Sequence, residues 1–265
     1  MKVRKITVIV LIIALSVLVG CGEKKYPENA VALVNGVIIT EQEIEKEITE
    51  RKMAIAIGEK IRSLEPNNLT PKEAVIQSLN ITEDELNPEQ IRYIESMERA
   101  TSKLLSGNEA FNILLREAIY YQEAVRQEHK VSVGEAKQIL EESNKVSKEA
   151  LNGDEEALQK QNEITKIITE VYKQYEFESE EDYLNQRIDK SAQAMTISRM
   201  KSQFNKVMTA NLPKSDGFQV SIDISNSWDD YGEFLLNKAK VKVLNTKYSM
   251  ELYGKPWSYG LLDLK

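Results

Sequence analysis

Histidine and cysteine are almost absent from this chain of 265 residues, which contains one of each, His129 and Cys21. One cysteine cannot form an intramolecular disulfide bond. The usual zinc sites need several clustered cysteines and histidines, and a catalytic Cys–His pair needs the two together, so we expect neither chemistry. His129 stands at the end of a predicted helix, where an imidazole most often interacts with the helix dipole and the terminal carbonyls.

Glycine-rich loops and an excess of positive charge are also missing. The eleven glycines are scattered over predicted turns without the spacing that cradles phosphate, so we expect no cofactor. The chain has 35 Lys and Arg residues against 42 Asp and Glu residues, which gives a net charge of −7. An acidic surface argues against nucleic acid as a partner and against broad electrostatic adhesion to anionic lipid.

Acidic residues run together at Glu41–Glu50, Glu83–Glu85 and Glu178–Asp182. Each run lies in or at the start of a predicted helix, where carboxylates complement the helix dipole and face solvent. A hydrolase with two paired carboxylates stays open as an alternative, but no pattern selects two of these residues over the others. We therefore name no catalytic residue and expect no enzyme activity.

Residues 1–20 have the pattern of a targeting segment. Three basic residues precede Ile6–Val17, an apolar stretch too short to span a membrane comfortably. Leu18-Val19-Gly20-Cys21 resembles the bacterial lipobox, which implies cleavage before Cys21 and lipid on its thiol and amino groups. Two or three acyl chains, at ~0.8 kcal/mol per buried methylene, would hold the chain firmly on the membrane. An uncleaved signal anchor is the alternative.

Cleavage would change the charge and length of the chain. It removes three basic residues and no acidic ones, so the net charge falls from −7 to −10, and 245 residues remain. The lipid places the protein at the bacterial cell membrane, facing the extracytoplasmic side. Residues 21–30 are mostly polar and are interpreted as a tether.

The stretch from Val31 to Ile48 predicts a hairpin joined directly to a helix. Two β-branched runs flank Asn35-Gly36, a dipeptide that readily adopts the positive φ angles of a type I′ turn. Thr40 can cap the following helix, and Glu43 can close a capping box. An isolated hairpin is marginally stable at best, so a third strand or a helix has to come from elsewhere in the chain.

Further helices are expected along the middle of the chain. Thr70 with Glu73, Asn87-Pro88 and Ser132 with Glu135 have the patterns of helix starts. Residues 109–129 form the clearest amphipathic helix. A helix from Glu180 to Thr209 would be roughly 45 Å long.

The last part of the chain predicts strands on either side of a short helix. Phe218, Val220, Ile222 and Ile224 alternate with polar residues, as in one strand. Ser227 is expected to cap a helix over 228–238, and Ala239–Leu244 follows as a second strand. The tail, 245–265, is rich in aromatic residues without clear periodicity.

Three segments together resemble the SurA/PrsA group of extracytoplasmic foldases and chaperones. The first has Val34-Asn35-Gly36 and Ile38-Ile39-Thr40 in 31–48. The second segment is 109–140 and the third is 227–244. The three segments follow one another in the same order as in that group. The motif residues of the second segment are Tyr120, Tyr121, Ala124, Val131, Ser132, Glu135 and Ala136, and the run of the third is Tyr231–Leu244.

This resemblance implies an α+β fold, mostly α, in which helices surround a small antiparallel sheet of the N-terminal hairpin and a C-terminal strand. The chaperone domain would be 31–244, with 58–107 as a helical elaboration. Many members carry a parvulin prolyl-isomerase domain before the closing segment. Only 16 positions separate Asn211 from Ser227, and a domain needs about 50 residues, so we expect no isomerase.

The function that the resemblance implies is a chaperone or holdase, which binds unfolded or partly folded exported polypeptides on an exposed apolar surface. A dedicated scaffold for one envelope or secretion partner is the alternative. For the methionines of the long helix, core packing is the ordinary interpretation and an adaptable binding face the functional one. The candidate client-contact residues are Met195, Met200, Tyr248, Tyr253, Trp257 and Tyr259.

Overall fold

The computed structural model describes residues 26–64, 69–150, 154–211 and 217–252, together with 257, 262 and 264. The signal peptide, Cys21 and the first part of the tether therefore lie outside the described residues. So do the predicted turn at 66–68 and the helix end at Asn152-Gly153.

The N-terminal hairpin forms as expected. Strands β1 (Ala30–Val34) and β2 (Val37–Thr40) pair antiparallel, and Asn35 and Gly36 between them have φ angles of 49° and 96°. Two consecutive positive φ angles are the signature of the type I′ turn that Asn-Gly favours. The sequence therefore specified this hairpin locally.

The helix start next to the hairpin is confirmed as well. Helix α2 (Glu41–Arg62) begins with the predicted capping box, in which the Thr40 amide donates to the Glu43 carboxylate at 2.8 Å. Ile39 and Ile44 on either side of the cap are both buried in the main core. The direction of α2 is thus fixed by the residues that end the hairpin.

The third strand comes from the other end of the chain, as predicted. β3 (Val241–Val243) pairs antiparallel with β1, so the strand order is β2-β1-β3. Ala32 faces Val243 across this pair, and the Leu244 amide donates to the Val31 carbonyl at 2.8 Å. The fold class is therefore α+β and mostly α, with a small three-stranded antiparallel sheet.

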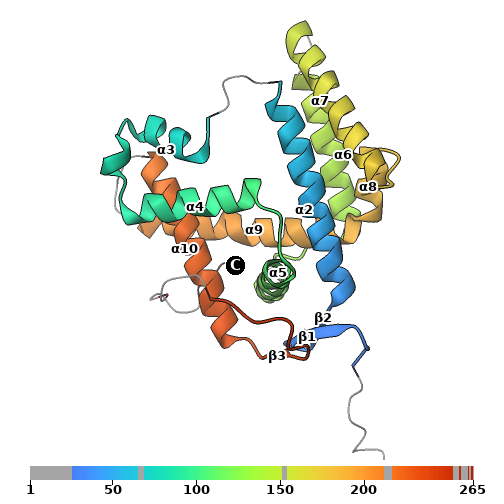
Figure 1. Ribbon diagram of the computed structural model, residues 1–265, viewed down its shortest axis with the longest axis vertical. Coiled ribbons are helices and arrows are strands. Elements are labelled where there is room, and N and C mark those ends of the chain that lie inside the picture. The colour runs from blue at the N-terminus through green and yellow to red at the C-terminus, as the bar shows by residue number, and fades with distance from the viewer. Residues whose placement is uncertain are drawn as a thin grey trace, which may run out of the picture.

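The remaining helices lie to one side of the sheet and pack on one another (Figure 1). They are α3 (Pro71–Leu79), the 3₁₀ helix η1 (Glu83–Glu85), α4 (Pro88–Ser102), α5 (Gly107–Arg126), α6 (Val133–Ala150), α7 (Glu155–Gln174), α8 (Glu180–Gln186), α9 (Ile188–Asn211) and α10 (Gly217–Lys238). The segment 58–107 is thus largely helical, as expected. The sheet lies at one end of the longest axis, and the tips of α6 and α7 lie at the other.

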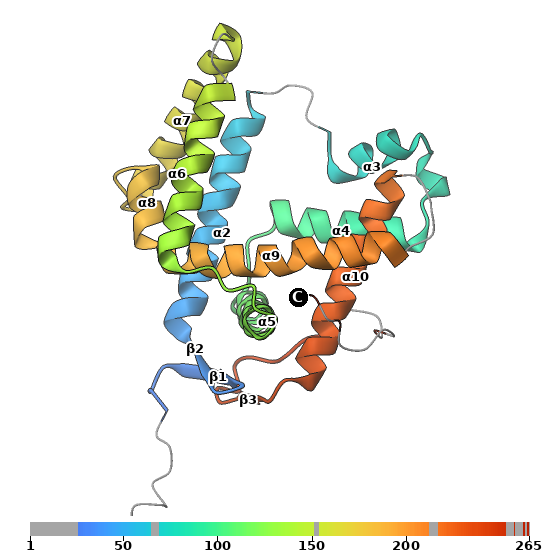
Figure 2. The same ribbon diagram turned by 180° about the vertical axis from the view of Figure 1, so that it is seen from behind.

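Helix α5 is the centre of the main core. It packs against α2, α9, α10 and the sheet, and Phe111, Leu115 and Ile119 supply its buried face. On one side α2, α6, α7 and α8 form one lobe, and on the other α3, α4 and α10 form a second (Figure 2). Helix α9 runs across α5, which is seen end-on in Figure 2, and contacts both lobes.

The predicted strand over Phe218–Ile224 is wrong, because these residues form the first turns of α10. Their alternation arises because the helix packs on two sides. Ile222 is buried with Val75 and Ile94 of the α3–α4 lobe, whereas Ile224 packs against the main core. Ser227 lies inside α10 and so does not cap it.

Two helix boundaries also differ from the prediction. The long helix is broken at Arg187 into α8 and α9, and the Arg187 side chain turns to an ion pair with Glu50 of α2. Ser106, expected to end a helix, instead caps the start of α5, which ends at Arg126. The tertiary ion pair at Arg187 has no local signal in the sequence.

Candidate functional site

The main cleft of the described part of the chain lies between the two lobes. It has a volume of about 620 Å³ and is lined by residues of α2, α4, α5 and α10 and by the segment after β3. Leu105 and Ile113 are apolar, but most of the lining is charged or polar. This charged lining differs from the exposed apolar surface that the chaperone resemblance implies, so the cleft is not that surface.

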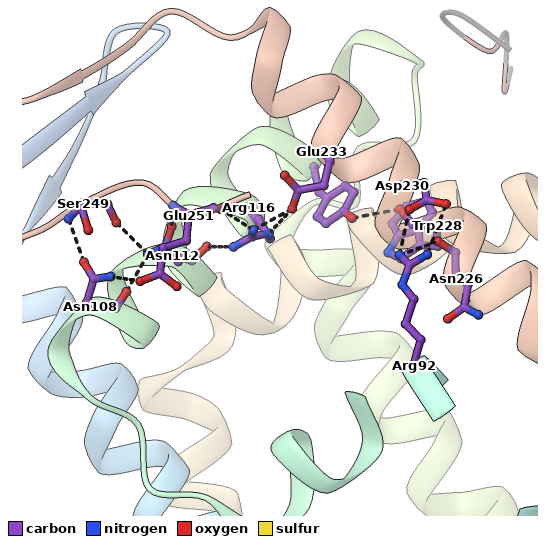
Figure 3. A network of polar contacts seen from close by, with 11 residues as sticks. Arg92, Asn108, Asn112, Arg116, Asn226, Trp228, Asp230, Glu233, Ser249 and Glu251 are labelled. Carbon is purple, nitrogen blue, oxygen red and sulfur yellow. Dashed lines mark hydrogen bonds and ion pairs between the residues drawn. The ribbon is translucent and has the colours of Figure 1, made fainter. Parts of the chain in front are cut away.

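Arg116 of α5 organises the inner end of this cleft (Figure 3). Its Nη2 donates to Glu233 Oε1 of α10 and to the Glu251 carbonyl, both at 2.7 Å, and its Nη1 donates to the Asn112 carbonyl at 3.1 Å. The guanidinium therefore joins α5, α10 and the C-terminal segment at one point. Both side chains of this ion pair are largely buried, so removing either one would leave a buried charge without its partner.

Glu233 has one oxygen without a partner. Its side chain is buried, and Oε2 makes no hydrogen bond within the described residues. Asp229, one turn earlier on α10, also lines the cleft. Burial raises the pKa of Asp229, while the positive charges of Arg92 and Lys201 oppose this effect. Glu233 Oε2 is therefore a buried acceptor without a partner in the described part of the chain, beneath the surface of the cleft.

A second ion pair joins α4 to α10. Arg92 Nη2 donates to Asp230 Oδ1 at 2.7 Å (Figure 3). Asn226 Nδ2 donates to the Glu89 carbonyl at 3.1 Å. Together with Arg116 and Glu233, this pair places fixed charges on two walls of the cleft. Such preorganised charges favour a partner with a matching pattern over unrelated ones.

The segment after β3 is bound along α5 by amide side chains. Asn108 Oδ1 accepts from the Ser249 amide at 2.7 Å, and Asn112 Oδ1 accepts from the Glu251 amide at 2.8 Å. Further along α5, Gln127 Nε2 donates to the Leu262 carbonyl at 2.7 Å. Each amide side chain makes a hydrogen bond that a neighbouring strand would otherwise make with the backbone of this extended segment. The described part of 245–265 is therefore an integral part of the core.

Two of the predicted client-contact residues lie in that core. Met200 is fully buried, so the ordinary interpretation of core packing holds for it. Tyr248 is 6% exposed, and its ring lies 5.6 Å from that of Phe111. Neither side chain is available to a client in this conformation, because each fills space between elements of the main core.

The other predicted contact residues are divided. Met195 is partly buried with Ala136 and Ala192 where α6 meets α9. The ring of Trp257 lies 5.4 Å from that of Tyr231 and packs against the main core. Tyr253 and Tyr259 lie outside the described residues.

Some exposed apolar side chains lie on α6 and α7, which extend away from the sheet (Figures 1 and 2). Val146 is 63% exposed, Leu158 48% and Ile139 37%. Ile139 and Val146 are seven residues apart and so share one face of α6. We name Ile139, Val146 and Leu158 the arm patch. The i, i+7 spacing was the signal in the sequence that could have identified it.

No family model, curated protein or solved structure matches this chain. None of the described helices is long and apolar enough to cross a membrane. The described residues also contain no group of three or more His, Cys, Asp and Glu side chains placed to hold a metal ion. The interpretation of function therefore rests on the sequence motifs and on the geometry of this chain.

Proposed function

We propose that this chain is a lipid-anchored, extracytoplasmic holdase that binds unfolded or partly folded exported polypeptides and has no prolyl-isomerase activity. The observation that carries the proposal is the exposure of the three apolar side chains of the arm patch on α6 and α7. The tips of these helices lie at the end of the molecule far from the sheet (Figure 1). Exposed apolar patches often mark interaction sites.

The topology supports the same proposal. The hairpin of 31–39 is completed by a strand from 241–243, which is the arrangement that the SurA/PrsA resemblance implies. A rigid base formed from both ends of the chain leaves α6 and α7 free to project. Contacts to a few apolar side chains, with low shape complementarity to any one client, would give fast and weak binding without ATP.

Suppression of aggregation tests this proposal. The mature chain in lipid nanodiscs should lower the light scattering of a test protein that is diluted from denaturant. The variant Ile139→Ser/Val146→Ser/Leu158→Ser should lose most of this effect because the apolar contact area is removed. The matched variant Leu69→Ser/Ile91→Ser/Leu104→Ser changes three residues of similar exposure elsewhere and should retain it. Unchanged scattering with excess parent protein would contradict the proposal.

A dedicated scaffold for one envelope or secretion partner is the second candidate function. The fixed charges of the cleft favour it, since Arg92 and Arg116 are held in place by Asp230 and Glu233 before any ligand binds. Crosslinking in the source cell distinguishes the two. Many different unfolded proteins joined to the arm patch would support the holdase, whereas one stoichiometric partner joined to the cleft would support the scaffold.

A further inference from the structure

The outer face of the sheet carries unpaired positive charge next to apolar side chains. Leu33 pairs with Ile38 on one side and with Lys242 on the other, so these three side chains share the face that points away from the main core. A shallow hollow of about 510 Å³ lies there, lined by Leu33, the Asn35-Gly36 turn and Lys240–Lys242. Val37 pairs with Val34, which is buried in the main core, so its side chain lies on the other face of the sheet. We name Leu33, Ile38, Lys240 and Lys242 the sheet patch.

Positive charge is concentrated around the sheet patch although the whole chain is acidic. Lys240 and Lys242 are exposed, and neither forms an ion pair within the described residues. Lys238 precedes them, and Lys247 follows within five residues of Lys242. Glu28 is an exposed carboxylate on the chain that leads into β1, and Glu41 after β2 accepts from Asn245 at 3.2 Å. Lys240 and Lys242 place two positive charges on the outer face itself.

The length of the tether limits how far this patch can lie from Cys21. Tyr26 is the first described residue, and Lys242 Nζ lies 5.6 Å from the centre of its ring. Cys21 is five residues before Tyr26, and a fully extended chain of five residues spans at most roughly 18 Å. A lipid on Cys21 would therefore hold the sheet patch within about two Debye lengths of the headgroups at physiological salt.

We propose that the sheet patch rests on anionic lipid headgroups and sets the orientation of the protein on the membrane. This inference rests on the proposed lipid attachment at Cys21 and does not depend on client binding. Lys240 and Lys242 match the charge of an anionic bilayer, and the apolar side chains between them fit its interface. The sheet lies opposite the tips of α6 and α7, so this orientation directs the arm patch away from the membrane.

The experiment uses the lipidated mature chain reconstituted into vesicles. Ile38 lies on the outer face, so the variant Ile38→Cys, in a chain whose Cys21 is acylated, has one free thiol there, which is labelled with a fluorophore and exposed to aqueous iodide. We expect iodide to quench the label much less in vesicles of equal phosphatidylcholine and phosphatidylglycerol than in phosphatidylcholine alone. A label at Val146→Cys on the arm should be quenched equally in both.

Charge reversal tests the role of the two lysines. Each lysine near an anionic surface favours contact by about fivefold, so loss of the two positive charges alone should lower the equilibrium constant for contact by roughly 25-fold. Lys240→Glu/Lys242→Glu also adds two negative charges, so it should lower this constant further and restore quenching at Ile38. The control Lys166→Glu/Lys173→Glu makes the same charge change on exposed residues of α7 and should have no effect.

Three results would overturn the inference. These are equal quenching of the Ile38 label in both kinds of vesicle, equal effects of the two charge reversals, and a mass spectrum that shows no lipid on Cys21. A protected Ile38 label together with no suppression of aggregation would retain the membrane contact and reject the holdase. The two proposals therefore fail separately.

Discussion

At the scale of single residues, the closest packing in the core lies where α10 crosses α5. A Cβ atom built on Gly232 would lie 2.0 Å from Tyr120 Oη and 2.6 Å from Tyr120 Cζ. The Tyr120 ring is held there because it stacks on Trp228, with 4.6 Å between the ring centres, and its hydroxyl donates to the Trp228 carbonyl at 3.2 Å. This position therefore requires glycine for space.

Gly232→Ala should lower the free energy of unfolding by about 1–3 kcal/mol, because the added methyl group overpacks the core. The control is Gly134→Ala in the first turn of α6, where a Cβ meets nothing within 4 Å. That change should be neutral or stabilising, since alanine favours a helix by about 1 kcal/mol over glycine. Urea denaturation of both variants measures the difference, and equal midpoints would contradict the steric explanation.

The ion pair of Arg116 with Glu233 gives a second prediction at this scale. Arg116→Met leaves a buried carboxylate without its partner, which should cost about 3–5 kcal/mol of stability. Arg116→Met/Glu233→Met removes both charges and should cost less than the single change. A double-mutant cycle by urea denaturation gives the coupling. If the stability losses of the two single substitutions simply add, the coupling free energy between Arg116 and Glu233 is zero and the prediction is contradicted.

At the scale of secondary structure elements, the helix starts share one device. The carboxylates of Glu43, Glu73 and Glu109 each accept from the amide of the capping residue three positions earlier. For Glu109 hydrogen bonds from Lys103 and Ser106 lower the pKa to about 2. A pKa below the ordinary value means that the ionised side chain stabilises the folded state near neutral pH.

This stabilisation should be lost as the pH falls from about 4.5 to about 2, because Glu109 then becomes protonated. Glu109→Gln keeps an acceptor at the cap but cannot titrate, so its stability should depend less on pH in that window. Chemical denaturation at a series of pH values measures this dependence. Glu142→Gln, an exposed change on α6, should follow the parent protein. A Glu109→Gln curve parallel to the parent curve would reject the role of the cap.

Local signals explain which elements could be predicted from the sequence. The Asn35-Gly36 turn and the caps at Thr40, Thr70 and Ser132 depend on residues three or fewer positions apart, and all were predicted correctly. Helix α10 was not, because Ile222 and Ile224 pack in different clusters and so imitate the alternation of a strand. The cleft was missed for a related reason, since Arg116 and Glu233 are 117 residues apart.

At the scale of the whole molecule, the C-terminal segment acts as a strap that holds α5. A chain that ends after Asn245 keeps β3 but leaves Asn108, Asn112 and Gln127 without their backbone partners. It also uncovers Phe111, because Tyr248 is removed. Burial of one such side chain contributes about 1.5–3 kcal/mol, so we expect the melting temperature to fall by roughly 10 °C.

Thermal denaturation followed by circular dichroism measures this loss. The control Met250→Ser/Leu252→Ser changes exposed side chains of the same segment and should leave the melting temperature nearly unchanged. A truncated chain that melts with the parent protein would show that the strap adds no stability.

The pairing of β1 with β3 also sets when the protein can finish folding. A chain that is made from its N-terminus has its hairpin almost at once, yet the neighbour of β1 arrives about two hundred residues later. Until then the edge of β1 that pairs with β3 has backbone amides and carbonyls without partners, and a strand of another chain can pair with them. Closing so long a loop is slow, so a newly made molecule passes through a stage in which this open edge has to be kept from pairing with other chains.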